Sequence, residues 1–202
     1  LVFEYTKYYR LAKYFAPNLK KSLMIGGCGY SYPKDYLDKF PEALLDVVEI
    51  DPAMTQLAKK YFGLKDNLRL TIYHEDGRAY LNRTDKKYDV IFGDAFNSFS
   101  SIPQQLTTKE AVQKEYDILN NDGVVILNTI SAIDGAKGKF FRAEYATYKT
   151  IFQEVYVLPV RNATDGKEVQ NIMIIAIKGD KKFDLVSSEP ELNGYLGHLW
   201  KE

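Results

Sequence analysis

The sequence predicts an α/β fold: a doubly wound, mostly parallel seven-stranded sheet that ends in an antiparallel hairpin. Two observations predict it. Short apolar runs alternate with helix-like segments through most of the chain, which is typical of parallel strands joined by crossover helices. The last two apolar runs are instead joined by residues 161–167, which have turn-forming types and no helical pattern. We therefore expect these two strands to pair antiparallel.

Each expected strand is an apolar run of strand length next to a turn or a helix-like segment. The run 88–93 is continuously apolar after its second residue, as expected for a strand buried on both faces. The expected strands cover residues 22–25, 44–50, 68–74, 88–93, 124–128, 154–160 and 169–178.

Helix boundaries follow from capping residues. Asp51 and Pro52 are an N-cap and a first-turn proline, and Gly63 is a C-terminal stop. Thr107 and Glu110 form a capping-box pattern for a later helix. The N-terminal helix has aromatic and aliphatic residues at helical spacing. The expected helices cover residues 3–16, 33–40, 52–62, 76–81, 107–120 and 139–152.

Composition bounds the protein class. The 202 residues, 46% of them hydrophobic, are enough for one domain over residues 1–180, followed by a tail, 181–202, with little signal. Lys+Arg and Asp+Glu number 27 each, so we expect no nucleic-acid partner. One cysteine excludes an intrachain disulfide and suits the cytoplasm. No apolar run is long enough to span a membrane, so we expect no membrane contact by this chain.

The first residue is Leu1 rather than Met. We therefore expect a piece of a longer protein, with room upstream for another domain or for a membrane segment. In the second case the chain is the soluble part of a membrane-attached protein.

Residues 22–31 contain the feature around which the site is expected to form. A strand-like run leads into Gly26, Gly27 and Gly29, and then into a helix start. Bare backbone beside a helix N-terminus receives ligand oxygens closely, so the stretch predicts a nucleotide-type pocket. The third glycine of a dinucleotide fingerprint is absent, since Tyr30 follows Gly29. Cys28 is expected to serve as a small turn residue rather than as a reactive thiol.

Acidic residues follow the next three expected strands. Glu49 lies about 20 residues beyond the glycines, where a carboxylate can accept both ribose hydroxyls. Its alternative role, a charge near the next helix, is filled better by Asp51. Asp76, next to Gly77, either caps its own helix or accepts a hydrogen bond from an adenine amino group, and both roles can hold together.

Asp94 is the residue that we expect to carry the reaction chemistry. It follows a buried strand and precedes a polar loop, 95–106, long enough to act as a lid. A carboxylate there can orient or deprotonate an amine, or stabilise a positive centre on the ligand. The alternative is a loop aspartate that accepts from backbone amides. His74 and His198 lack metal-ligand spacing, so we predict no metal site.

Several blocks of the chain, taken in order, resemble the spermidine synthase family within the class I S-adenosylmethionine-dependent methyltransferase superfamily. The resemblance spans about residues 4–178 and implies the Rossmann-like methyltransferase fold. The blocks cover residues 23–29, 48–52, 75–80, 88–95, 102–110 and 121–125.

The resemblance implies a role for each matching residue. Glu49 would bind the ribose, Asp76 the adenine, and Asp94 would assist deprotonation of the attacking amine, while Tyr5 and Asn97 would lie at the acceptor. The chain would bind S-adenosylmethionine or its decarboxylated form as co-substrate and transfer an aminopropyl group to a small amine, as in polyamine biosynthesis. The family commonly dimerises, so a homodimer is a further expectation.

The chain departs from the family pattern where the amine would bind. Gly29 and Asn97 replace two aspartates, and the tyrosine-proline motif expected after Val160 is absent. Three readings follow: an aminopropyltransferase, a methyltransferase that uses intact S-adenosylmethionine, and a non-catalytic nucleoside-binding module. In the second reading Gly29 is natural, because an aspartate there would repel the carboxylate of the donor.

Overall fold

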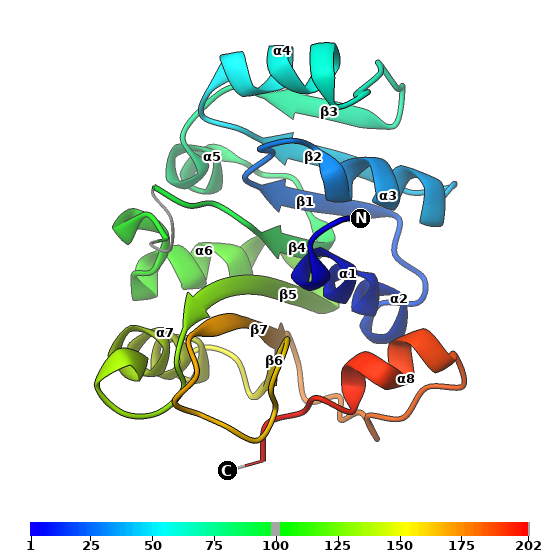
Figure 1. Ribbon diagram of the computed structural model, residues 1–202. Helices are drawn as coiled ribbons and strands as arrows, with labels where there is room; N and C mark the ends of the chain where they lie inside the picture. The colour runs from blue at the N-terminus through cyan, green and yellow to red at the C-terminus, as the bar shows by residue number, and fades with distance from the viewer. Residues whose placement is uncertain (98–101, 202) are drawn as a thin grey trace.

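The computed structural model describes residues 1–97 and 102–201. Its centre is one seven-stranded sheet in the order β3-β2-β1-β4-β5-β7-β6 (Figure 1). The strands from β3 to β5 are parallel, and β7 runs antiparallel to both β5 and β6, so the predicted sheet and its closing hairpin are confirmed. The strands are β1 (Lys21–Ile25), β2 (Leu44–Val48), β3 (Leu70–Tyr73), β4 (Tyr88–Gly93), β5 (Leu119–Ser131), β6 (Glu154–Pro159) and β7 (Gln170–Ile177).

Helices cover both faces of this sheet (Figure 1). The N-terminal segment, α3, α4 and α8 contribute to one apolar cluster, and α5, α6 and α7 contribute to the cluster on the other face. The N-terminal segment consists of α1 (Glu4–Tyr8), η1 (Tyr9–Leu11) and α2 (Ala12–Phe15). The other helices are α3 (Ser31–Lys39), α4 (Pro52–Tyr61), α5 (Gly77–Arg83), η2 (Gln104–Leu106), α6 (Lys109–Ile118), η3 (Ala136–Gly138), α7 (Lys139–Lys149) and α8 (Pro190–Leu196).

Side-chain alternation along β4 and β5 determines on which face of the sheet the side chains at their carboxyl ends lie. Phe92 and Ile126 are register partners and belong to the apolar cluster under the N-terminal segment. Because side chains alternate between faces with a period of two, Asp94 and Asn128 emerge on this same face. Continuing the register by two residues brings these two side chains next to one another.

Several expected boundaries differ from the structure, and two of the differences have a local cause. The cap of α6 is Thr108, whose hydroxyl accepts from the Ala111 amide, and not Thr107. Strand β5 begins at Leu119 rather than at Val124, because the chain pairs with Tyr88 before a register shift in β4. Polar residues 120–122, which carried turn signals in the sequence, have no register partner in this pairing and fall at the shift, where Asp122 has φ 59°. Part of the expected lid, residues 98–101, lies outside the described residues.

The tail also has a helix that the sequence analysis did not predict. The Leu192 and Leu196 side chains of α8 are each 3% exposed and join the cluster under the N-terminal segment. The Trp200 amide donates to the Val157 carbonyl at 2.8 Å, which ties the following residues to β6. In the described part of the chain, no helix is long and apolar enough to cross a membrane.

Candidate functional site

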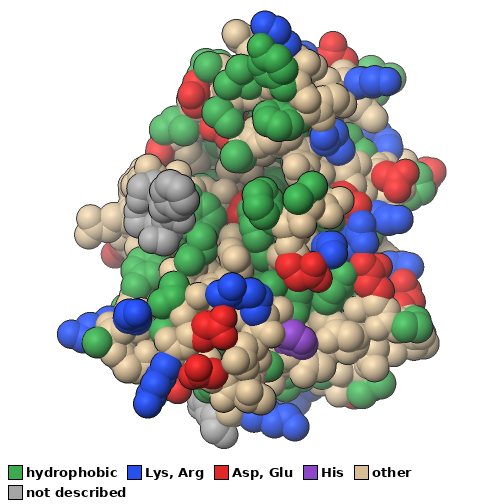
Figure 2. All heavy atoms as spheres, in the orientation of Figure 1, with side chains coloured by type: hydrophobic (Ala, Val, Ile, Leu, Met, Phe, Trp, Pro, Cys, Tyr) green, Lys and Arg blue, Asp and Glu red, His purple; other side chains and the backbone are tan. Residues whose placement is uncertain are grey.

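A cavity of about 390 Å³ lies at the carboxyl ends of β1, β2 and β4. This is where the strand order reverses from β1 to β4, the usual ligand crevice of an open α/β sheet. Figure 2 shows this face of the molecule, which is hollowed below α4. The cavity is lined by Tyr5, Ile25, Gly26, Cys28, Val48, Glu49, Ile50, Asp51, Met54, Asp76, Gly77, Asp94, Ala95, Phe96, Asn97, Pro103, Gln105 and Leu106.

The predicted glycines divide into two groups. Gly26 and Gly77 line the cavity, and both are required sterically: a Cβ at Gly26 would lie 2.4 Å from the Asp94 carbonyl oxygen, and one at Gly77 would lie 2.7 Å from Ile25. Gly26 also has φ 96°, which strongly favours glycine. Gly27 and Gly29 are not among the lining residues. A Cβ at Gly27 would clash with the Tyr30 ring, whereas a Cβ at Gly29 would make only ordinary contacts with Phe62 and Ser31, at 3.9 and 4.0 Å.

Glu49 shapes the glycine turn from the end of β2. Its Oε2 accepts from the Gly27 and Cys28 amides, each at 2.8 Å, and its Oε1 accepts from the Asp51 amide at 3.0 Å. A carboxylate has about four acceptor positions, so one remains for a ligand. The residue is 7% exposed and lines the cavity. Asp51 in turn caps α4, as predicted, by accepting from the Ala53 amide.

Asp76 caps a helix and also lines the cavity. Its Oδ1 accepts from the Ala79 amide at 3.0 Å and caps α5, while its side chain lines the cavity. Its Oδ2 accepts from the Gln105 Nε2 at 3.1 Å. Gln105, which the sequence analysis did not single out, is held by Arg78, whose Nη1 donates to its carbonyl at 2.9 Å.

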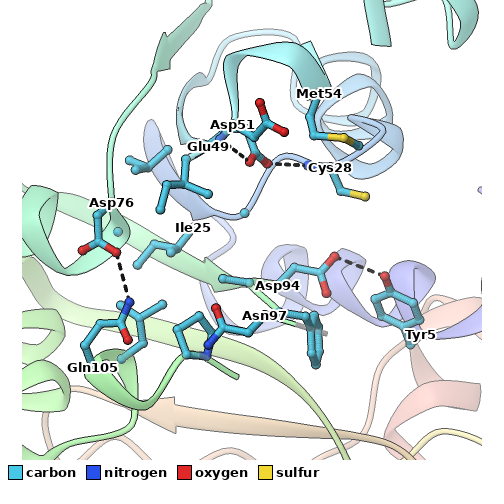
Figure 3. A pocket seen from close by; sticks show the side chains of 18 residues that line it. Tyr5, Ile25, Cys28, Glu49, Asp51, Met54, Asp76, Asp94, Asn97 and Gln105 are labelled. Carbon is cyan, nitrogen blue, oxygen red and sulfur yellow. Dashed lines mark hydrogen bonds between the residues drawn. The ribbon is translucent and has the colours of Figure 1, made fainter. Parts of the chain in front are cut away.

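Asp94 lies at the other end of the cavity from Asp76, with Glu49 between them (Figure 3). Its Oδ2 accepts from the Tyr5 hydroxyl at 3.2 Å, and its Oδ1 accepts from the Asn128 Nδ2 at 3.0 Å. Burial raises the pKa of Asp94 from 3.8 to about 6, opposed by these hydrogen bonds. Burial and the neighbouring carboxylate raise the pKa of Tyr5 well above its usual value, so the phenol keeps its proton.

Asn97 lines the same cavity at its exposed mouth, three residues beyond Asp94. Cys28 also lines it, with an exposed side chain and a left-handed backbone at φ 44°. The structure therefore brings Tyr5, Asp94 and Asn97 to one cavity with Glu49 and Asp76. Asn128 is a further neighbour of Asp94 that the sequence alone did not identify.

The charge of the cavity has one sign. Four carboxylates line it, and no Lys, Arg or His belongs to its described lining. Two backbone amides of the glycine turn are already engaged by Glu49. A ligand that carries positive charge is therefore favoured, and a ligand carboxylate would lack a cationic partner. Across residues 1–97 and 102–201, no group of three or more His, Cys, Asp or Glu side chains is arranged to hold a metal ion.

Comparison with known proteins gives a family. The family model described as "Spermine/spermidine synthase domain" matches residues 7–183. A polyamine aminopropyltransferase of Vibrio vulnificus (strain CMCP6) is 30% identical over 176 residues, which are 86% of this chain and 57% of that protein. The eEF1A lysine and N-terminal methyltransferase of Homo sapiens is 29% identical over 181 residues, or 84% of this chain and 24% of that protein. The chain thus spans about half or less of the length of these curated relatives.

Solved structures have the same fold. A spermidine synthase in complex with the transition state analogue AdoDATO superposes with a TM-score of 0.75 at 24% identity, covering 89% of this chain and 62% of that one. Human methyltransferase-like protein 13 in complex with SAH gives a TM-score of 0.73 at 23% identity, covering 97% and 90%. At these identities the likeness concerns the fold alone.

Proposed function

The chain belongs to the spermine/spermidine synthase domain family, and from this premise we propose that it transfers an aminopropyl group from decarboxylated S-adenosylmethionine to a small amine. The observation that carries the proposal is the charge of the cavity, which four carboxylates line without a described basic residue. The decarboxylated donor has a sulfonium and an ammonium but no carboxylate. It suits this lining better than intact S-adenosylmethionine, whose carboxylate would need a cation.

The order of the acidic residues along the cavity supports one orientation of a bound nucleoside. Asp76 at one end would accept from the adenine amino group, and Glu49 in the middle would accept from the ribose hydroxyls (Figure 3). Gly26 and Gly77 would let the backbone approach the nucleoside closely. The sulfonium would then lie towards Asp94, at the end where Tyr5 and Asn97 line the cavity.

The reaction proposed at that end is an in-line displacement. The acceptor enters as an ammonium ion and loses a proton to Asp94, and the lone pair this frees forms a bond to the carbon attached to the sulfonium. The carbon–sulfur bond breaks, its electron pair stays on sulfur, and methylthioadenosine leaves. Holding the nitrogen and the carbon in line supplies most of the acceleration in such a reaction. The sulfur carries a positive charge in the donor and leaves as a neutral thioether, so no further activation of the leaving group is needed and we propose a reaction without a metal.

A methyltransferase is the second candidate, favoured by one comparison. The human relative at 29% identity is named a lysine and N-terminal methyltransferase, and it matches 84% of this chain. Gly29 fits this candidate, because no acidic side chain at that position would repel the donor carboxylate. Under either candidate we propose that residues 1–180 form the catalytic domain, with its N-terminal helical segment, and that it acts in the cytoplasm as a homodimer.

Calorimetric titration of the purified chain tests the proposal. We expect decarboxylated S-adenosylmethionine and methylthioadenosine to bind at least tenfold more tightly than intact S-adenosylmethionine. Glu49→Gln should weaken all three, while Glu42→Gln, at an exposed position outside the cavity, should leave them unchanged. Tightest binding of intact S-adenosylmethionine would favour the methyltransferase, and no binding of any of the three would contradict both enzymatic candidates.

A further inference from the structure

A chain of two side-chain amides leads from Asn171 on β7 through Asn128 on β5 to Asp94. The Asn128 Nδ2 donates to the Asp94 Oδ1 at 3.0 Å, and the Asn171 Nδ2 donates to the Asn128 Oδ1 at 3.0 Å. Asn128 is 1% exposed, and neither asparagine lines the cavity. On the antiparallel pair β5·β7, Asn128 lies opposite Met173, so Asn171 is its diagonal neighbour on the same face.

The chemistry of the groups fixes the direction of this chain. An ionised carboxylate accepts hydrogen bonds and donates none, so Asn128 must turn its amino group towards Asp94. Its carbonyl oxygen then faces Asn171, which must donate. Asn171 therefore determines which end of the Asn128 amide meets the carboxylate, and it does so through Asn128.

We propose that Asn128 and Asn171 are positioning residues for Asp94: Asn171 orients the Asn128 amide, and Asn128 holds the carboxylate so that its other oxygen meets Tyr5. Tyr5 and Asn128 bind different oxygens of Asp94, and together they fix the plane of the carboxylate. The effect of the two asparagines on the reaction rests on the proposed role of Asp94 as the base. Their effect on the orientation and the pKa of the Asp94 carboxylate does not depend on that role.

The groups around Asp94 do not change their own charge in the neutral range, so a change in the Asp94 pKa can be attributed to its hydrogen bonds. From the N-terminal segment, Tyr5 and Tyr9 face it, and burial raises the pKa of both, so each stays protonated in the neutral range. No described cation compensates the carboxylate, and the hydrogen bonds oppose the rise in its pKa that burial causes. Loss of the Asn128 donor should therefore raise the Asp94 pKa further.

The test is a carboxyl-carbon NMR titration of the unliganded protein, with Asp94 assigned through Asp94→Asn. In Asn171→Leu, which removes the donor at similar volume, we expect the Asp94 midpoint to rise by about 0.5 to 1 pH unit. The matched control is Thr129→Val, next to Asn128 on β5 and equally buried, whose side chain points to the opposite face. It should leave the midpoint unchanged.

A double-mutant comparison tests the route of the effect. Asn128→Leu should raise the midpoint at least as much as Asn171→Leu, and adding Asn171→Leu to it should produce no further rise. If Asn128→Leu does not fold, the comparison of Asn171→Leu with Thr129→Val still decides. An unchanged midpoint in Asn171→Leu, or an equal rise in the control, would overturn the inference.

Kinetics then separate the inference from the proposed function. If Asp94 is the base, the acidic limb of the pH–rate profile in Asn171→Leu should move upward with the NMR midpoint, with KM for the donor nearly constant. An NMR shift together with full turnover by Asp94→Asn would contradict the proposed base while supporting the amide chain. A shift in the rate profile without an NMR shift would overturn the amide chain.

Discussion

Asp94 is a carboxylate that accepts hydrogen bonds from Tyr5 and Asn128, faces Tyr9 and has no described cationic partner, and these surroundings determine how it should titrate. Its pKa is raised from 3.8 to about 6 because burial disfavours the charged form. A base with a pKa near 6 is ionised at neutral pH and still has appreciable affinity for a proton. Its two oxygens are oriented by Tyr5 and Asn128.

Activity should therefore depend on pH with a sign that the site fixes. The base acts when deprotonated, so kcat/KM should be constant above about pH 7 and fall about tenfold per unit well below the Asp94 pKa of about 6. Asp94→Asn should reduce turnover at least 100-fold while nucleoside affinity stays within about threefold. Initial rates between pH 5 and 8 check the profile, and calorimetry checks the affinity.

Asp122→Asn is the matched control, because Asp122 is exposed, lies outside the cavity and has φ 59°, a conformation that asparagine tolerates. It should leave the rate unchanged. A profile without an acidic limb, or normal turnover by Asp94→Asn, would show that Asp94 is not the base.

The sequence predicted which acidic residues follow the strands and line the cavity. It did not predict which side chains donate hydrogen bonds to them. Glu49, Asp76 and Asp94 come directly after apolar runs, and parallel strands end at one edge, so their proximity could be expected. Gln105 and Asn128 carried no such signal. Their contacts depend on strand register and on the path of a loop, which periodicity does not report.

The interface between α6 and α7 buries two acids away from the cavity. The Tyr148 hydroxyl donates to the Glu115 Oε2 at 2.8 Å, while the Glu144 Oε2 has no hydrogen-bond partner among the described residues. Burial raises the pKa of each glutamate from 4.5 to about 8. Both are therefore protonated in the folded protein at neutral pH, whereas the unfolded chain would release the protons.

Stability should consequently fall as pH rises through this window. The folded state binds more protons than the unfolded state between about pH 4.5 and 8, so the free energy of unfolding decreases across that range. Glu115→Gln removes one of the two titrations, and its melting temperature should exceed that of the wild type by several degrees at pH 8 but not at pH 5. Scanning calorimetry from pH 5 to 9 measures the difference, with the exposed Glu42→Gln as control.

Most elements followed from local signals, and the exceptions have physical reasons. Strands buried on both faces are continuous apolar runs, so the sheet could be predicted and is confirmed. Helix α8 was not predicted because it has only seven residues, too few for a periodic pattern, and is stabilised by packing of Leu192 and Leu196. Thr107 and Thr108 are adjacent candidates for one cap, and only the backbone geometry distinguishes them.

On the scale of the whole molecule, the two ends of the chain pack together. Arg10 pairs with Asp35 of α3 at 2.6 Å and with Glu191 of α8 at 2.5 Å. The ring centroids of Tyr8 and Tyr195 lie 4.6 Å apart. The N-terminal segment, which supplies Tyr5 to the cavity, is thus held between the sheet, α3 and α8.

This packing makes the tail part of the folded core. Leu196→Ala should lower the free energy of unfolding by about 2 to 4 kcal/mol, because it removes a side chain that is 3% exposed and leaves a cavity. Val186→Ala, at a position that is 63% exposed, should change it by less than about 0.5 kcal/mol. Urea denaturation measures both, and equal effects would mean that the tail contributes no core.

The packing of α1 against α8 also determines which part of the structure can form last during translation. A ribosome adds residues from the N-terminus, so Tyr5 emerges early, but the surface that α8 gives its helix exists only after translation has passed Leu196. The glycine turn and the parallel strands precede that point in the nascent chain. The end of the cavity next to Asp94 would therefore be completed last, so a stalled chain could contain the end of the cavity formed by Glu49 and Asp76 before the end formed by Asp94 and Tyr5.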